Sequence, residues 1–136
     1  MIGFAGLSHL GIVSSIAAAS RGVEVVAFDP DEELCRELAS GRLPIQEPGL
    51  PELLAGNRDR IRFEATAAAL AGCEVVCFSI DVPTDRGNQG HPSVVRDRVL
   101  EVAAHAMPRA VLVVLSQVPP GFTRTLAGEV RRRHPG

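Results

Sequence analysis

The chain contains no tryptophan and no tyrosine, and only five of its 136 residues are phenylalanine. Most of these phenylalanines lie in apolar runs, so the sequence offers no row of exposed aromatic rings on which nucleic-acid bases stack. The formal net charge is −2, which gives no general attraction to nucleic acid. The basic run Arg131-Arg132-Arg133 is expected to end a helix, where cations complement the helix dipole. We therefore expect no nucleic-acid partner.

Cysteines and long apolar runs are also scarce. The three cysteines, Cys35, Cys73 and Cys77, are odd in number and have no C-x-x-C spacing, which argues against a disulfide framework and against a zinc site. We expect buried free thiols and no metal. No run reaches the roughly 20 apolar residues that span a membrane, and no cationic segment precedes the first apolar run, as a signal peptide requires. The sequence therefore predicts a cytoplasmic protein without a membrane partner.

What the chain does contain is a regular alternation of strand and helix signals. Strands are expected at residues 2–5, 23–28, 61–63, 74–80 and 110–115. Helices are expected after Gly6, from Pro30 to Gly41, near residues 52–55, over 65–71, around 95–106 and over 123–133. This alternation predicts one α/β domain over residues 1–136, with a parallel sheet between two helical layers. Right-handed crossovers then give a doubly wound Rossmann sheet of strand order 3-2-1-4-5.

The turn after the first strand is the most informative segment. Residues 6–11 read Gly-Leu-Ser-His-Leu-Gly, close to the G-x-G-x-x-G pattern of dinucleotide-binding βαβ units. Gly6 permits the tight turn, and Gly11 lets the helix pack closely on the strand. Ser8 replaces the middle glycine, and its hydroxyl adds bulk but also a hydrogen-bonding group. The pattern predicts a pyrophosphate site at the helix N-terminus; alternatively, the two glycines serve only the turn and the packing.

Asp29 follows the second predicted strand, where a carboxylate accepts hydrogen bonds from an adenosine ribose. A carboxylate repels a 2′-phosphate, and no arginine directly follows Asp29 to neutralise that phosphate. The sequence therefore favours NAD over NADP. The alternative is that Asp29 caps the helix that Pro30 begins.

Ligands of a doubly wound sheet bind outside the carboxyl ends of the first and fourth strands. The segments predicted to meet there are residues 6–11, 81–85 and 116–121, which are polar or rich in proline. Asp81 and Asp85 resemble an acid–base pair, but Pro83 between them favours a turn.

Four blocks along nearly the whole chain resemble the NAD-binding domain of the UDP-glucose/GDP-mannose dehydrogenase family. The first is the glycine-rich turn with Asp29. The second, residues 43–50, reads L-P-I-Q-E-P-G-L against the family's L-P-I-Y-E-P-G-L and is the most specific, because a Rossmann fold has no general need for it. Residues 81–85 align with G-T-P-x-D, and residues 116–121 align with S-T-V-P-x-G.

The resemblance implies a role for each matching position. The residues implied to line the pyrophosphate are Gly6, Leu7, Ser8, His9, Leu10 and Gly11. Asp29 is implied to hold the adenosine ribose, and Val82 and Pro83 to flank the nicotinamide half. Asp81 is implied to lie beside the cofactor, and Gln117 near the reacting centre. The chain departs from the family at Ser8, at Asp81-Val82 for Gly-Thr, and at Gln117 for Thr. For Glu47, within the most specific block, the sequence gives no physical role.

The activity implied by the resemblance is a two-step oxidation of a nucleotide sugar, UDP-glucose to UDP-glucuronate, with two NAD reduced, as in polysaccharide biosynthesis. The family's catalytic residues lie in a later strand and in a sugar-nucleotide domain. We therefore expect a truncated chain that lacks that domain, carries no catalytic residue and is inactive alone. A homodimer stays open, and the fifth strand is expected to leave an exposed edge. The alternatives are a non-catalytic module that binds nucleotide weakly or not at all, and a dehydrogenase of another hydroxy substrate.

Overall fold

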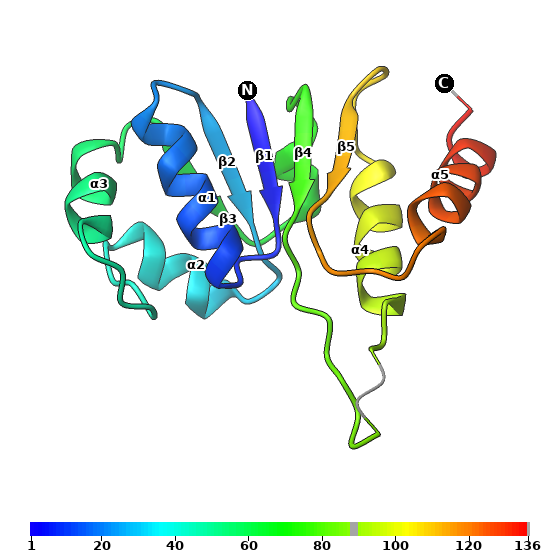
Figure 1. The fold of residues 1–136 in the computed structure, drawn as a ribbon. Coiled ribbons are helices and arrows are strands. Elements are labelled where there is room, and N and C mark those ends of the chain that lie inside the picture. Colours follow the sequence, from blue (N-terminus) through cyan, green and yellow to red (C-terminus); the bar gives the residue numbers. More distant parts are fainter. Residues whose placement is uncertain (88–89, 136) are drawn as a thin grey trace.

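The structure is a computed structural model that describes residues 1–87 and 90–135. Its sheet has five strands in the order β3-β2-β1-β4-β5, and every pairing is parallel. The strands are β1 (Ile2–Ala5), β2 (Val25–Phe28), β3 (Ile61–Glu64), β4 (Val75–Phe78) and β5 (Val111–Val114). The predicted doubly wound Rossmann fold and its strand order are confirmed (Figure 1).

Helices cover both faces of this sheet (Figure 1). They are α1 (His9–Ser20), α2 (Glu32–Ala39), α3 (Leu50–Gly56), the 3₁₀ turn η1 (Ala67–Leu70), α4 (Ser93–Ala103) and α5 (Phe122–Arg133). One core lies under α1, α2 and α3, and the other lies under η1, α4 and α5. The predicted three-layer arrangement is therefore confirmed.

The strands β2 and β1 separate the two cores. Val25 and Ala27 belong to the core under α1, whereas Val26 and Phe28 belong to the core under α4. All residues of β2 are buried, because successive side chains of a strand point to opposite faces and both faces are covered. This explains why β2 reads in the sequence as an unbroken apolar run.

Several element boundaries differ from the prediction, most clearly in the helices. The helix predicted from Pro30 begins instead at Glu32, and its N-cap is Asp31, whose side chain accepts a hydrogen bond from the Leu34 N–H at 3.0 Å. The alternative in which Asp29 caps this helix is therefore wrong. The helix predicted over residues 65–71 is a single 3₁₀ turn, and α4 ends before Ala106. Cys77 is half-buried, whereas Cys35 and Cys73 are buried as expected.

The far edge of the sheet carries β5 and α5. Within the described chain β5 pairs with β4 alone, and Val111 is 55% exposed, so the expected exposed edge is present. The helix α5 is tied to α4 by Arg96, whose Nε donates to Glu129 at 2.8 Å.

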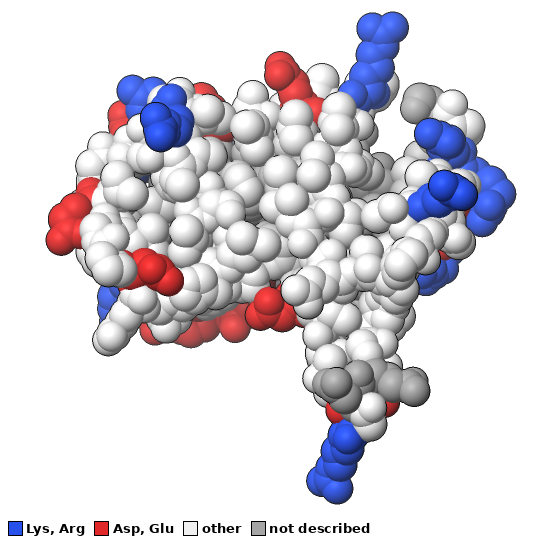
Figure 2. Space-filling model, viewed as in Figure 1, with Lys and Arg blue, Asp and Glu red and all other residues white. Residues whose placement is uncertain are grey.

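Figure 2 shows basic side chains gathered over α5, and acidic side chains along the lower edge, where the strands end. None of the helices formed by the described residues is long and apolar enough to cross a membrane.

Candidate functional site

The turn between β1 and α1 requires glycine at its first position. Gly6 has φ +95°, a left-handed conformation that residues with a Cβ rarely adopt. A Cβ at this position would also lie 2.6 Å from Cγ1 of Ile80. The Gly6 N–H donates to the Phe28 carbonyl at 2.9 Å. The chain therefore leaves β1 in a tight turn that stays bonded to β2.

Gly11 lets the first turn of α1 lie directly on that glycine turn. A Cβ on Gly11 would lie 2.0 Å from the carbonyl oxygen of Gly6 and 2.7 Å from Oγ of Ser79. Ser79 in turn donates to the Gly6 carbonyl at 2.8 Å. The predicted close approach of helix and strand is therefore present, and it directs the N-terminus of α1 to the carboxyl end of the sheet.

Ser8 stands where the dinucleotide-binding pattern has its middle glycine, and the structure accommodates it without strain. Its φ is −66°, which any residue adopts. Its hydroxyl donates to the Ser79 carbonyl and accepts from the Gly11 N–H at 3.3 Å. Ser8 is thus the N-cap of α1, and its hydroxyl is engaged with the protein itself.

The first turn of α1 presents hydrogen-bond donors to a ligand. The N–H groups of His9 and Leu10 have no partner within the described residues, as helix geometry predicts for the first turn. Together with the positive end of the helix dipole they form a site suited to an anion. A pyrophosphate therefore fits the donors that this turn offers.

Asp29 connects the end of β2 with this turn. Its carboxylate accepts from the Leu7 N–H at 2.9 Å and from the Asp31 N–H at 3.0 Å. Each carboxylate oxygen has a second lone pair, so the half-buried side chain retains acceptor capacity for ribose hydroxyls. The bonds to Leu7 and Asp31 fix the direction in which that capacity points.

Two adjoining hollows lie at the carboxyl ends of the strands. The larger, of about 390 Å³, is lined by residues that include Leu10, Val82 and Gln117. The smaller, of about 300 Å³, is lined by residues that include Leu7 and Asp29. The residues that border both are Ser8, Ile80 and Asp81. The structure therefore brings together the three segments that the sequence predicted to meet here.

Of the residues that the sequence predicted for the site, His9, Gly11 and Pro83 border neither hollow. The His9 side chain is exposed, and its Nε2 lies 2.7 Å from Oε1 of Glu47. Pro83 borders neither hollow, and its carbonyl accepts from the His91 N–H at 3.0 Å. Asp85 accepts from the Gly87 N–H at 2.8 Å, a bond typical of the turn role predicted for it.

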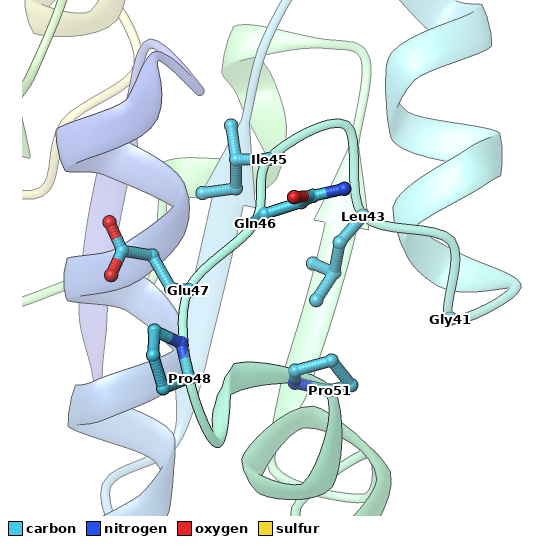
Figure 3. A pocket seen from close by; sticks show the side chains of 7 residues that line it. All are labelled: Gly41, Leu43, Ile45, Gln46, Glu47, Pro48 and Pro51. Carbon is cyan, nitrogen blue, oxygen red and sulfur yellow. The ribbon is translucent and has the colours of Figure 1, made fainter.

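Glu47 now has a physical partner. Figure 3 shows its carboxylate turned toward α1, on the segment that lines an open groove of about 580 Å³ between Gly41 and Pro51. The pair with His9 joins this segment to the start of α1. Sequence reasoning placed both residues in family blocks but did not connect them, because they are separated by 38 positions.

Arg98 was missed entirely at the level of sequence. It comes from α4 and borders the smaller hollow together with Asp29 and Pro30. A signal was available, since Arg98 lies three positions after the buried Val95 and four before the buried Val102, on the same side of α4. A cation that close to a buried face is half-covered by neighbouring elements.

A sequence model described as the UDP-glucose/GDP-mannose dehydrogenase family, NAD binding domain, matches residues 1–135. The chain belongs to this family. As its NAD-binding domain, the chain combines the glycine turn, the free donors of α1 and Asp29 at one end of a Rossmann sheet. Its cofactor is NAD.

Relatives in this family are nucleotide-sugar dehydrogenases. UDP-glucose 6-dehydrogenase of Rhizobium meliloti is 34% identical over 96% of this chain and 31% of its own length. UDP-N-acetyl-D-mannosamine dehydrogenase of Pyrococcus horikoshii is 28% identical over 90% of this chain and 29% of its own length. The solved UDP-glucose dehydrogenase of Pyrobaculum islandicum superposes with a TM-score of 0.88 at 26% identity, over 97% of this chain and 32% of that one. The chain thus spans about a third of the length of these relatives.

Proposed function

We propose that the NAD-binding domain holds its cofactor across the carboxyl ends of β2, β1 and β4. The pyrophosphate lies against the free N–H groups of His9 and Leu10, with Gly6, Leu7, Ser8 and Gly11 shaping the turn beneath it. Asp29 accepts the adenosine ribose hydroxyls. The observation that carries this proposal is the meeting of the α1 N-terminus and Asp29 at two adjoining hollows.

The nicotinamide half is proposed to occupy the larger hollow. Val82 and Gln117 border that hollow from the segments after β4 and β5, and Asp81 stands between the two hollows. We propose that Pro83 also lies near the nicotinamide, since its ring restricts the backbone next to Val82. Bound NAD supplies a hydride acceptor, and these residues orient it.

We further propose that the chain is the cofactor domain of a cytoplasmic nucleotide-sugar 6-dehydrogenase that serves polysaccharide biosynthesis, with UDP-glucose as the substrate of the whole enzyme. The 34% identical UDP-glucose 6-dehydrogenase supports this choice. The second candidate substrate is UDP-N-acetyl-D-mannosamine, supported by the 28% identical dehydrogenase of that sugar. We assign no catalytic residue to this chain and expect that it alone does not reduce NAD with either sugar nucleotide.

The first test is a calorimetric titration of the chain with NAD and with NADP, repeated with Asp29→Asn. Asparagine keeps an oxygen that can accept from the Leu7 N–H but has no charge. A weaker affinity of this variant can therefore be assigned to the lost charge and not to unfolding of the turn. We expect a dissociation constant for NAD between micromolar and low millimolar. NADP binding should be at least about tenfold weaker because Asp29 repels the 2′-phosphate, and Asp29→Asn should weaken NAD binding by about tenfold.

Two outcomes would contradict the proposal. A folded chain that binds no NAD would leave the non-catalytic module as the better interpretation. A chain that binds NAD and also reduces it with UDP-glucose, followed by the absorbance of NADH, would show that catalytic residues are present here after all.

A further inference from the structure

Arg98 is held in a defined position at the wall of the smaller hollow. Its guanidinium carbon lies 5.3 Å from the centroid of the Phe28 ring, within the range of a cation–π contact. Its Nη1 also pairs with Glu101 one turn later on α4, and its side chain is only 22% exposed. A long side chain held by two partners has little rotamer freedom left to lose when a ligand binds.

The hollow that Arg98 borders is the adenosine end of the proposed site. Asp29 lies in the same hollow and is the acceptor proposed for the adenosine ribose. Pro30 and Ile80 supply apolar walls there. The free N–H groups at the start of α1 belong to His9 and Leu10, and Leu10 borders the larger hollow, where Arg98 does not reach.

We propose that Arg98 is a further cofactor-binding residue, which contacts the adenine ring of NAD through its guanidinium group. The inference rests on the proposed function and deepens it. A guanidinium is planar and weakly hydrated, and it stacks on aromatic faces. Arg98 already lies over the Phe28 ring, and adenine is the flat aromatic part of the ligand that would enter beside Asp29.

The surroundings favour the base over a phosphate as the partner of Arg98. Asp29 and Asp81 border the same hollow, and Glu101 pairs with the guanidinium itself. These carboxylates neutralise Arg98 and repel a second anion placed among them. An uncharged aromatic ring meets no such repulsion.

The test measures the dissociation constants of NAD and of ADP-ribose for the wild-type chain, Arg98→Met and Arg98→Lys. Methionine still covers Phe28, and lysine keeps the charge, but neither has a planar guanidinium. We expect both variants to bind NAD and ADP-ribose about 3- to 10-fold more weakly. An equal loss for ADP-ribose would place the contact outside the nicotinamide ring, since this ring is the part of NAD that ADP-ribose lacks.

Arg21→Met is the matched control, because Arg21 is exposed at the opposite end of α1; its dissociation constants should equal those of the wild type. Far-ultraviolet circular dichroism and the thermal midpoint confirm that each variant is folded.

A folded Arg98→Met with an unchanged dissociation constant overturns the inference alone. An Arg98→Lys variant that binds as tightly as the wild type also overturns it, because the positive charge alone would then account for the contact. Failure of the wild-type chain to bind either ligand would instead overturn the proposed function, and this inference with it.

Discussion

At the scale of single residues, the glycine-rich turn separates positions that need glycine from one that does not. Gly6 needs it for its φ of +95°, and Gly11 needs it because a Cβ would meet the Gly6 carbonyl at 2.0 Å. Ser8 lies between them with an ordinary φ of −66° and turns its hydroxyl to Ser79. The departure from the dinucleotide-binding pattern at Ser8 is therefore compatible with the same turn.

Gly11→Ala is expected to destabilise the domain. The new methyl group meets the backbone of Gly6 and the side chain of Ser79, so α1 must move off the turn, at a cost of about 1–3 kcal/mol or more. We expect a matching fall in the free energy of unfolding, measured by urea denaturation, together with weaker NAD binding.

Gly128→Ala provides the control for this substitution. Gly128 lies inside α5, and the atom nearest to its added Cβ is the flexible end of Arg132 at 3.7 Å. Alanine should therefore stabilise the helix by roughly 0.5–1 kcal/mol. If Gly11→Ala were as harmless as Gly128→Ala, the close packing of α1 on the turn would be wrong.

At the scale of elements, the segment between α2 and α3 is fastened to α1. Leu43 and Ile45 pack against the core under α1, and Glu47 meets His9 at 2.7 Å. Gly49, with φ +80°, then leads into α3. The block of residues 43–50 thus connects α1, α2 and α3. This gives a physical role to a segment that the general Rossmann fold does not require.

A double-mutant cycle with His9→Gln and Glu47→Gln tests the connection. Both side chains are largely exposed, at 58% and 42%, so we expect a coupling free energy of only about 0.2–1 kcal/mol, measured by urea denaturation. A cycle of His9→Gln with Glu52→Gln, for which the described residues contain no ion-pair partner, should show no coupling. Additive effects in the first cycle would contradict the pairing.

At the scale of the whole molecule, the cysteine thiols are almost the only side chains that lose a proton in moderately alkaline solution. All 14 cationic side chains are arginine, and tyrosine is absent, so among the side chains only cysteine titrates between about pH 8 and 11. Burial raises the pKa of Cys35, Cys73 and Cys77 above the ordinary value of 9.0. The folded state therefore holds these three protons more tightly than the unfolded chain does.

This difference predicts a loss of stability in alkali. The contribution of the thiols is fully present below the unfolded pKa and disappears as the pH rises through the higher folded values. We expect the free energy of unfolding, measured by urea denaturation, to be steady from about pH 7 to 8 and to fall above about pH 9. Replacing the three cysteines by alanine should flatten this fall. An equally steep fall in the variant would assign it to other groups.

Much of the fold follows from local sequence features. The apolar period of two or 3.6 residues marks strands and helices, and right-handed crossovers then fix the strand order. The start of α2 is harder to predict from the sequence, because Asp29 and Asp31 are both of a residue type that commonly caps helices. In the structure Asp31 caps α2, and the Asp29 carboxylate instead accepts from the N–H groups of Leu7 and Asp31.

The sequence by itself determined the fold class, the strand order, the glycine turn and the segments that meet at the carboxyl ends of the strands. Only the tertiary structure decided that Ser8 bonds Ser79, 71 positions away, that His9 pairs with Glu47, and that Arg98 borders the hollow of Asp29. The physical reason is that periodicity and glycine act through the local backbone. Which distant side chains touch depends instead on strand register, helix rotation and the competition of each polar group for its partners.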